Sequence, residues 1–256
     1  MPKVAIVTGA SSGIGKEMAL KLAQQGYQVG VIARREALLK EVVTKIDASG
    51  GKGCFAVCDM ADRKSVVAAI RSIESMLGPT DLLIANAGIA DSVSINRFNI
   101  DSVERLFQVN VLGLVYCIEA VLPAMKQRRS GQIVGISSLA SWLAFPGSWA
   151  YSASKAAVNK ILLGVRRESR RYGIHVTTIC PGFVKTPMTD DIGHKMPLVL
   201  DADKAADLML NAIEQKKKFY AYPWLLFVLV QLSRIIPEFI YSFAFGFQRK
   251  TYKKNQ

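Results

Sequence analysis

Tyr151 and Lys155 stand four residues apart in a stretch with helical patterning. At that spacing their side chains share one face of a helix, one turn apart. A phenol can act as a general acid toward a ketone oxygen or as a general base toward an alcohol, and a cation on the next turn favours the phenolate. The pair alone is a weak signal. Its weight comes from two further polar residues, Ser138 near the end of a strand-like run and Asn110 within the preceding long helical pattern.

A glycine-rich turn near the N-terminus has the features of a phosphate-binding site. Residues 8–15 read Thr-Gly-Ala-Ser-Ser-Gly-Ile-Gly and join a short apolar run to a helical pattern. Glycines permit positive φ and let backbone N–H groups approach a pyrophosphate, and the helix N-terminus adds partial positive charge. A triphosphate-binding P-loop is excluded, because Ala10 and Glu17 occupy two of the positions that this motif requires. We therefore expect a dinucleotide at this turn.

Two other interpretations of the turn stay open. Residues 9–13 match the Gly-x-Ser-x-Gly nucleophile elbow, in which Ser11 would be the nucleophile of a hydrolase. Such elbows normally follow several strands, however, and no convincing acid–histidine pair is visible downstream. The other alternative is a tight turn that binds no ligand.

The second strand-like run ends in Ala33, and Arg34 and Arg35 follow it. An NAD site usually has an acidic residue here, which holds the ribose hydroxyls. A guanidinium can instead pair with a 2′-phosphate through charge-assisted, bidentate hydrogen bonds. The sequence therefore predicts NADP(H) in preference to NAD(H), unless Arg34 is only a solvated charge at the start of a helix.

Two short motifs complete the pattern: Asn-Ala-Gly at 86–88 follows a fourth strand-like run, and Pro-Gly at 181–182 follows a sixth. With them the chain resembles the classical short-chain dehydrogenase/reductase family, whose motifs in order are Thr-Gly-x3-Gly-x-Gly, Asn-Ala-Gly, a helical Asn, a Ser, Tyr-x3-Lys and Pro-Gly. The resemblance covers about residues 3–222. In composition only, the C-terminal tail is also reminiscent of lipid- and steroid-reducing, membrane-associated members.

The resemblance implies a catalytic role for each of the four polar residues. Tyr151 would be the general acid in ketone reduction and the base in alcohol oxidation. Lys155 would lower the pKa of this phenol and hold the nicotinamide ribose. Ser138 would orient the substrate carbonyl oxygen, and Asn110 would hold a water that links Lys155 to solvent. The nicotinamide itself would carry the hydride.

The resemblance also implies contacts with the rest of the cofactor. Asp59 would meet the adenine amine, although it could instead only start the next helix. The 86–88 motif would line the adenosine ribose, and the region from 181 to 186 would flank the nicotinamide carboxamide, unless Pro-Gly is only a turn. The expected cofactor-binding residues are Gly9, Ser11, Ser12, Gly13, Ile14, Gly15, Arg34, Arg35, Asp59, Met60, Asn86, Ala87, Gly88, Tyr151, Lys155, Pro181, Gly182, Val184 and Thr186.

Short apolar runs alternate with longer helical patterns along the chain. Because these runs are apolar on both faces, helices should cover both sides of the sheet that they form. Such alternation predicts an α/β, Rossmann-type, doubly wound and mainly parallel sheet of about seven strands, with the ligand at the strands' carboxyl ends. We assign 1–222 to the catalytic domain and 223–256 to a hydrophobic C-terminal extension. The expected strands are 3–8, 28–33, 53–58, 81–85, 131–137, 174–180 and 218–222, and the expected helices are 13–25, 36–48, 63–77, 101–128, 151–172 and 202–215.

The composition excludes several other classes of protein. Of the 256 residues 50% are hydrophobic, with 19 Gly, 9 Pro and 4 Cys, which fits neither a disordered nor a collagen-like chain nor a disulfide scaffold. The cysteines have no ligand-like spacing with His175 or His194, so we expect no metal site. The apolar run at 3–8 is too short for a signal peptide, and we expect a cytosolic start.

The net charge of +13 is concentrated near the C-terminus, where residues 215–256 hold eight Lys and Arg against Glu238 alone. Within this tail 15 residues, Phe219–Ser233, carry no charge, fewer than the roughly 20 that a spanning helix needs. Apolar segments flanked by the basic clusters at 216–218 and 249–254 predict peripheral or monotopic membrane contact on the cytoplasmic side, through 216–254. An oligomer interface is the alternative. Nucleic-acid binding is not expected, because no recognition module accompanies the charges.

Together these features predict an NADP(H)-dependent oxidoreductase that interconverts a ketone and a secondary alcohol on a hydrophobic, lipid-like substrate. A Met- and Leu-rich stretch at 187–200, the substrate lid in this family, fits an apolar pocket, although plain packing explains it nearly as well. The alternative function is an NADPH-binding sensor or scaffold protein without turnover. The resemblance further implies a homodimer or homotetramer, formed through the helices at 101–128 and 151–172.

Overall fold

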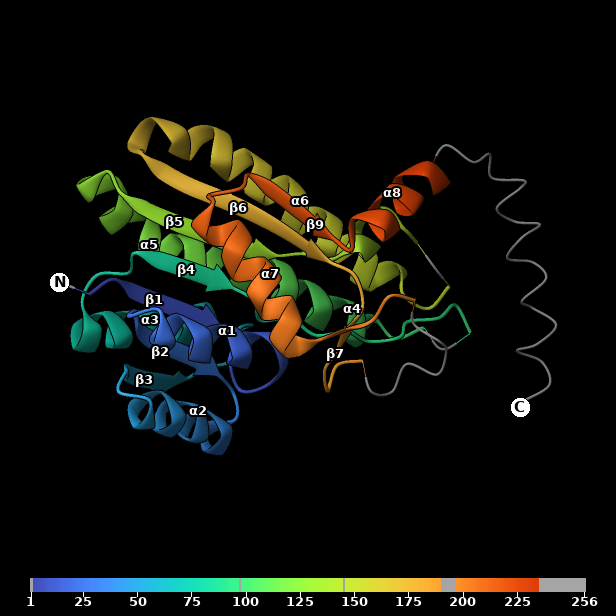
Figure 1. Ribbon diagram of the computed structural model, residues 1–256. Helices are drawn as coiled ribbons and strands as arrows, with labels where there is room; N and C mark the ends of the chain where they lie inside the picture. The colour runs from blue at the N-terminus through green and yellow to red at the C-terminus, as the bar shows by residue number, and fades with distance from the viewer. Residues whose placement is uncertain (1, 97, 145, 190–196, 235–256) are drawn as a thin grey trace.

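The computed structural model describes residues 2–96, 98–144, 146–189 and 197–234. At its centre lies a seven-stranded sheet with the order β3-β2-β1-β4-β5-β6-β9 (Figure 1). Every neighbouring pair of strands in it is parallel, which confirms the predicted doubly wound α/β fold. The strands are β1 (Val4–Thr8), β2 (Gln28–Ala33), β3 (Lys52–Val57), β4 (Leu82–Ala85), β5 (Gly131–Ile136), β6 (Ile174–Pro181) and β9 (Phe219–Tyr222).

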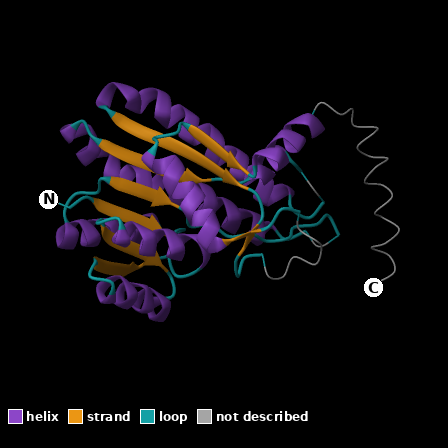
Figure 2. Cartoon of the chain, in the orientation of Figure 1, coloured by secondary structure: helices purple, strands orange, loops and turns teal. Residues whose placement is uncertain are grey.

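Helices cover both faces of the sheet (Figure 2). Successive side chains of a strand point to opposite faces, so Ala5 and Val7 lie in one hydrophobic cluster while Val4 and Ile6 lie in the other. The first cluster packs under three helices, α1 (Gly13–Gln24), α2 (Glu36–Ala48) and α7 (Ala202–Glu214). The second packs under α3 (Arg63–Leu77), α5 (Gly113–Arg128) and α6 (Trp149–Ser169).

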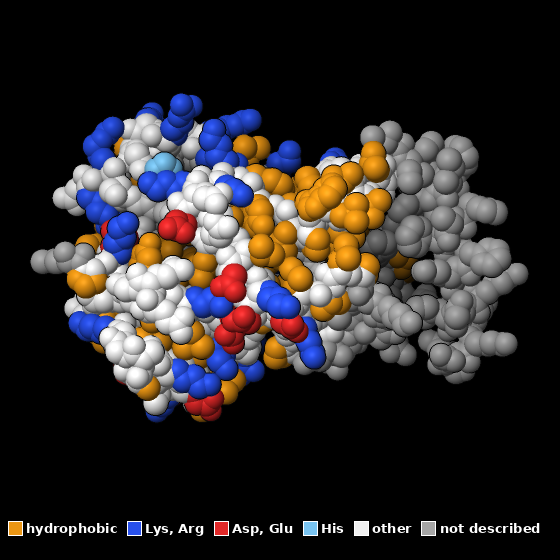
Figure 3. Space-filling view, viewed as in Figure 1, with side chains coloured by type: hydrophobic (Ala, Val, Ile, Leu, Met, Phe, Trp, Pro, Cys, Tyr) orange, Lys and Arg blue, Asp and Glu red, His pale blue; other side chains and the backbone are white. Residues whose placement is uncertain are grey.

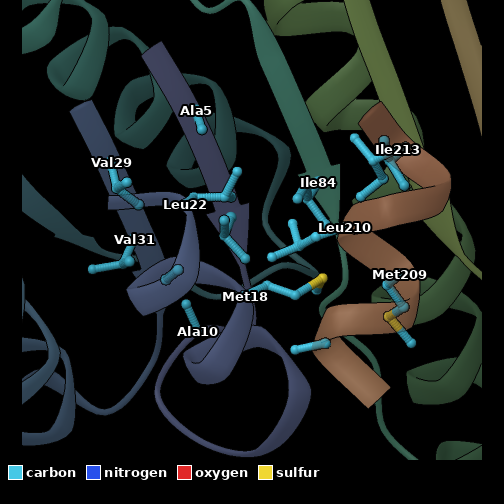
Figure 4. Packing of buried hydrophobic residues seen from close by; sticks show 14 of the residues in the cluster. Ala5, Ala10, Met18, Leu22, Val29, Val31, Ile84, Met209, Leu210 and Ile213 are labelled. Atoms are coloured by element: carbon cyan, nitrogen blue, oxygen red, sulfur yellow. The ribbon is translucent and has the colours of Figure 1, made fainter. Parts of the chain in front are cut away.

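The packing of α1 against α7 sets the direction of the glycine-rich turn. Met18 and Leu22 of α1 meet Leu210 and Ile213 of α7 over the strands β1 and β4 (Figure 4). Fully burying a side chain of this size stabilises the fold by about 1.5–3 kcal/mol. Because α1 is held along its length in this way, its N-terminus is fixed at the carboxyl end of β1.

The order of the strands opens a crevice at one edge of the sheet. From β1 the sheet grows through β2 and β3 on one side, and through β4, β5, β6 and β9 on the other. The loops after β1 and β4 therefore leave in different directions, and ligands of such sheets bind at this switch point. In Figure 1 the carboxyl ends of the strands face right, where α4 (Ile100–Phe107) and the two-residue strand β7 (Val184–Lys185) also lie.

Three features differ from the sequence-based expectation. The helix expected at 101–128 is interrupted by a π-helical turn at Gln108–Leu112, because one extra residue in a turn leaves the apolar periodicity nearly unchanged. The helix expected at 151–172 begins at Trp149 and ends in a 3₁₀ turn, Arg170–Tyr172. A small parallel pair, β7 and β8 (Leu200–Asp201), was not predicted, because two residues are too few to show an alternating pattern.

The described part of the C-terminal tail is one apolar helix, α8 (Trp224–Ser233), which follows β9 through Pro223. Phe227 of α8 packs edge-on against Trp142, with ring centroids 5.5 Å apart. The tail residues 235–256, with the basic cluster at 249–254, lie outside the described residues. Elsewhere, the helical run Ile100–Arg128 has the length and hydropathy of a membrane span, but 56% of its apolar window is buried inside the protein, as in a core helix.

Candidate active site

The glycine-rich turn is shaped by close backbone contacts that only glycine permits. Gly9 and Gly13 have positive φ angles of 67° and 57°. A Cβ on Gly9 would lie 2.8 Å from Ala87 Cα, and a Cβ on Gly15 would lie 2.5 Å from both Gly9 O and Asn86 Nδ2. The spacing of the three glycines is therefore a packing requirement, and it presents the first backbone N–H groups of α1 at the crevice.

Asn86 and Thr8 fasten the two strands on either side of the crevice. The Thr8 hydroxyl oxygen accepts hydrogen bonds from Asn86 N at 3.1 Å and Ala87 N at 3.0 Å. The Asn86 side-chain nitrogen donates to Thr8 O at 2.9 Å. Asn86 therefore also has a structural role beside the expected contact with the ribose. Its side-chain amide nitrogen holds the end of β4 to the end of β1.

The two arginines after β2 lie in different surroundings. Arg35 Nη2 donates to Ser11 Oγ at 2.9 Å and to Ser12 Oγ at 2.6 Å, so this guanidinium lies across the glycine-rich turn. Arg34 lies instead toward Asp59, where its charge lowers the pKa of that carboxyl group. Both arginine side chains line the crevice.

The serine of the hydrolase interpretation has no catalytic base beside it among the described residues. Ser11 Oγ accepts from Arg35, and His175 lies opposite Gln132 near the start of β6, at the other edge of the sheet. His194 lies outside the described residues. The described surroundings of Ser11 therefore suit a phosphate-binding turn better than a nucleophile.

Asp59 forms an ion pair with Arg105 at this end of the crevice. Arg105 Nη2, from α4, donates to its two carboxylate oxygens at 2.9 and 2.7 Å. Burial tends to raise the pKa of Asp59, but the hydrogen bond from Ala61 N and the bond and charge of Arg105 bring that pKa below its ordinary value. Asp59 is therefore ionised at neutral pH. Arg105 was missed in the sequence, because no motif links it to a residue 46 positions away.

Tyr151 and Ser138 meet at the other end of the crevice. Their side chains share a hydrogen bond, which favours the phenolate, but burial outweighs it and raises the pKa of Tyr151 above its ordinary value. The expectation that Lys155 lowers this pKa stays a prediction, since the group that lowers it here is Ser138. Lys155 Nζ lies 5.8 Å from the centre of the Tyr151 ring and donates a hydrogen bond to Ile136 O at 3.0 Å.

Lys155 is itself perturbed by its surroundings. Its side chain is 4% exposed, and burial lowers its pKa from 10.5 to about 8. The ammonium group lies near Gly88, since a Cβ on that glycine would be 3.2 Å from Lys155 Nζ. Because this buried ammonium group lines the crevice, it can donate hydrogen bonds to hydroxyl groups of a ligand there.

Asn110 links two segments next to the crevice through its side-chain hydrogen bonds. Its side-chain oxygen accepts from Ile89 N at 2.8 Å, and its nitrogen donates to Ile89 O and to Ser154 Oγ, both at 3.0 Å. The π-helical turn that carries Asn110 thus joins the loop after β4 to α6. Asn110 is 2% exposed and, alone among the expected site residues, does not line the crevice.

All the other expected catalytic and cofactor-binding residues line this one crevice. The structure brings together residues from Gly9 to Thr186, which the fold collects at the carboxyl ends of the strands. Their types also fit a dinucleotide: glycines and a helix N-terminus at one end, and hydroxyl, phenol and ammonium groups at the other. The crevice is also lined by residues outside the expected catalytic and cofactor-binding sets, namely Ala33, Cys58, Ile89, Val109, Ile136, Ser137, Pro187, Met188 and Thr189.

The sequence predicts no metal site. The described residues contain no group of three or more His, Cys, Asp or Glu side chains that could hold a metal ion. Cys180, whose thiol lies near Lys155, is buried, and burial raises the pKa of this thiol to about 12.

Comparisons with known proteins agree with the geometry. A family model described as short chain dehydrogenase matches residues 3–197. An uncharacterized oxidoreductase of Myxococcus xanthus (strain DK1622) is 33% identical over 242 residues, covering 94% of this chain and 96% of the relative. The 3-oxoacyl-(acyl-carrier-protein) reductase FabG of Staphylococcus aureus (strain MW2) is 35% identical over 197 residues, covering 77% and 80%. A solved short chain dehydrogenase/reductase from Burkholderia phymatum, in complex with NAD, matches with a TM-score of 0.82 at 25% identity, covering 90% of this chain and 92% of that one.

Proposed function

The chain belongs to the short-chain dehydrogenase family, and from this premise we propose that it reduces hydrophobic ketones with NADPH, or oxidises the corresponding alcohols with NADP⁺. As a member it is an oxidoreductase that acts on CH–OH groups with a nicotinamide cofactor. The observation that carries the proposal is the convergence of Ser138, Tyr151 and Lys155 on the crevice that the glycine-rich turn also lines.

Each catalytic side chain has a distinct task in the proposed reaction. The bound nicotinamide supplies or accepts the hydride. Tyr151, whose raised pKa keeps the phenol protonated at neutral pH, donates its proton to the carbonyl oxygen. Ser138, hydrogen-bonded to this phenol, holds the same oxygen in line. Lys155 holds the nicotinamide ribose and passes a proton back to Tyr151, along a path that Asn110 helps to shape.

The preference for NADP(H) rests on this chain's own residues. The Burkholderia relative was solved with NAD, so the family alone does not decide between the two cofactors. Here no acidic residue directly follows Ala33 at the end of β2. Arg34 and Arg35 line the crevice in its place, and both can pair with a 2′-phosphate.

Apolar side chains near Tyr151 along the chain and in the lining of the crevice support a hydrophobic substrate. Phe98 is 60% exposed and stacks on Trp149, with ring centroids 6.2 Å apart. Met188 lines the crevice and is 46% exposed. The remaining part of the expected lid, 190–196, lies outside the described residues. The name of the Staphylococcus relative also specifies a ketone on an acyl chain, which belongs to the same class of substrate.

The activity test compares NADPH and NADH oxidation with ketones of increasing chain length. The proposal expects turnover that prefers NADPH and whose kcat/KM rises with chain length, because each buried CH₂ contributes about 0.8 kcal/mol. Equal use of NADPH and NADH would contradict the cofactor preference. A kcat/KM that is independent of chain length would contradict the hydrophobic substrate.

We also propose that α8 contacts a membrane surface. Trp224, Leu225, Leu229 and Leu232 are 46–72% exposed on one side of this helix, while Val230 is buried on the other side. Figure 3 shows hydrophobic side chains gathered at the upper right, where Figure 1 places α8. An apolar helix face of this kind fits the boundary between lipid headgroups and acyl chains.

The basic cluster at 216–218 does not flank this helix as we expected. It precedes β9, whereas α8 begins beyond the other end of the same strand, and four strand residues separate the two by about 13 Å. Contacts with anionic headgroups therefore depend on Arg234 and on cations outside the described residues.

Flotation with vesicles of phosphatidylcholine and phosphatidylserine tests the membrane contact. The wild type should float with the vesicles, and a variant with Leu229→Glu and Leu232→Glu should remain in the dense fraction while it still turns over a short soluble ketone. If the wild type does not float and the variant instead loses subunits, as judged by its mass in solution, α8 is an oligomer interface.

A further inference from the structure

Asp59 lies between two guanidinium groups at the adenosine end of the crevice. Arg105 contacts both of its carboxylate oxygens, at 2.9 and 2.7 Å. Arg34 acts on the same carboxylate through its charge alone. Within the described residues Asp59 forms its ion pair with Arg105, so the charge of Arg34 is left facing the crevice.

The backbone holds Arg34 and Asp59 close to each other. Cys58 N donates to Ala33 O at 3.0 Å, which joins the ends of β2 and β3. Arg34 and Asp59 each come one residue after this hydrogen bond. Since Asp59 is ionised and 42% exposed in its side chain, it would pair with Arg34 if nothing else held it.

We propose that Arg105 determines cofactor specificity, because by holding Asp59 it keeps Arg34 available for the 2′-phosphate of NADP(H). Released from Arg105, the carboxylate would pair with Arg34 through charge-assisted hydrogen bonds and would repel a phosphate dianion. NAD(H) has no 2′-phosphate, so it loses no phosphate contact when Asp59 pairs with Arg34. The inference rests on the proposed preference for NADP(H), and it places a specificity residue on α4, outside the loop after β2.

A purely structural role of Arg105 makes a different prediction. If the ion pair served only to hold α4 against the sheet, its loss would weaken the binding of NADP⁺ and NAD⁺ by the same factor. The ratio of the two dissociation constants therefore separates a role in specificity from a role in structure.

The experiment measures the Kd of NADP⁺ and of NAD⁺ by titration calorimetry at one fixed ionic strength. The full-length wild type is compared with Arg105→Gln, with Asp59→Asn and with the double variant. Arg71→Gln is the matched control, since it removes an exposed arginine that pairs with Glu74 on α3, away from the crevice. Arg105→Gln should weaken NADP⁺ binding about tenfold, the scale of one diverted charged hydrogen bond, and should change NAD⁺ binding less than about threefold.

The double variant completes the test. When Asp59→Asn is added to Arg105→Gln, position 59 carries no charge to pair with Arg34, so the NADP⁺/NAD⁺ ratio should return close to that of Asp59→Asn alone. Equal losses for both cofactors in Arg105→Gln, or a ratio that the second substitution does not restore, would overturn the inference. A wild type that does not prefer NADP⁺ would instead refute the proposed cofactor preference, and the wild-type titration alone shows this.

Discussion

At the scale of single residues, the candidate site is built from groups that are costly to bury. Burial lowers the pKa of Lys155 to about 8 and raises that of Tyr151, so each side chain is shifted toward its neutral form. Perturbed groups of this kind collect at active sites. Burial of these two groups therefore lowers the free energy of unfolding. In return it places a protonated phenol and an ammonium group in the crevice.

Replacement of Lys155 should show this cost directly. Folding favours the neutral amine, because the pKa is lower in the folded protein than its value of 10.5 when unperturbed. The destabilisation is therefore fully present below pH 8, at about 3 kcal/mol, and disappears as the pH rises from 8 to 10.5. Lys155→Met removes it and loses the hydrogen bond to Ile136 O, so we expect a net gain of about 1–2 kcal/mol at pH 7, together with loss of turnover.

Thermal unfolding of Lys155→Met and the wild type, measured from pH 7 to pH 10.5, checks this expectation. The variant should be more stable at pH 7, and the two melting temperatures should converge as the pH rises. A variant that is less stable at pH 7, or a difference that does not change with pH, would contradict the account.

Single residues also mark the limit of what the sequence predicts. Tyr151, Lys155, Ser138 and the glycines could be named because they follow motifs with fixed spacing. Arg105 could not, because its role depends on α4 being folded against the end of β3. The raised pKa of Tyr151 could not be predicted either, since it depends on how deeply the folded protein buries the phenol.

At the scale of elements, a chain of hydrogen bonds joins the two segments that carry the catalytic groups. Asn159, two turns after Tyr151 on α6, donates to Ser141 Oγ at 2.8 Å. Ser141 Oγ in turn donates to Ser138 O at 2.7 Å. The turn that carries Ser138 is thereby fixed to the helix that carries Tyr151, and we infer that Asn159 is a positioning residue.

Asn159→Ala should disturb this alignment without affecting the cofactor site. We expect kcat to fall by about tenfold, since small displacements of reacting groups slow catalysis strongly, while the Kd of NADPH and the KM of the ketone change by less than about threefold. Asn211→Ala, on the exposed side of α7, is the matched control. An unchanged kcat, or equal changes in kcat and in NADPH affinity, would argue against a positioning role.

Elements with a regular pattern were the ones that the sequence predicted well. The seven strands of the sheet begin and end close to the expected residues, because each is a short run rich in apolar residues between turn residues. The π-helical turn around Asn110 and the short pair β7 and β8 were not predicted, because tertiary contacts rather than local patterns stabilise them. α8 appeared in the sequence only as an apolar stretch.

At the scale of the whole molecule, the parallel sheet gathers its chemistry at one edge. Residues between Gly9 and Thr186 line one crevice, because every strand of the sheet points its carboxyl end the same way. α8 lies beyond this same edge in Figure 1. A membrane contact through α8 would therefore bring the crevice near the lipid surface, which suits a substrate dissolved in lipid.

The central claim is that Tyr151 protonates a ketone while NADPH supplies the hydride. The most direct test measures NADPH consumption with a hydrophobic ketone in the wild type and in Tyr151→Phe, with NADPH binding measured on the same samples. The account predicts a loss of about 10²–10⁴-fold in turnover, with NADPH affinity unchanged within about threefold. Undiminished turnover in Tyr151→Phe would contradict the mechanism, and a wild type that binds NADPH but reduces no ketone would identify the chain as a cofactor-binding sensor or scaffold protein.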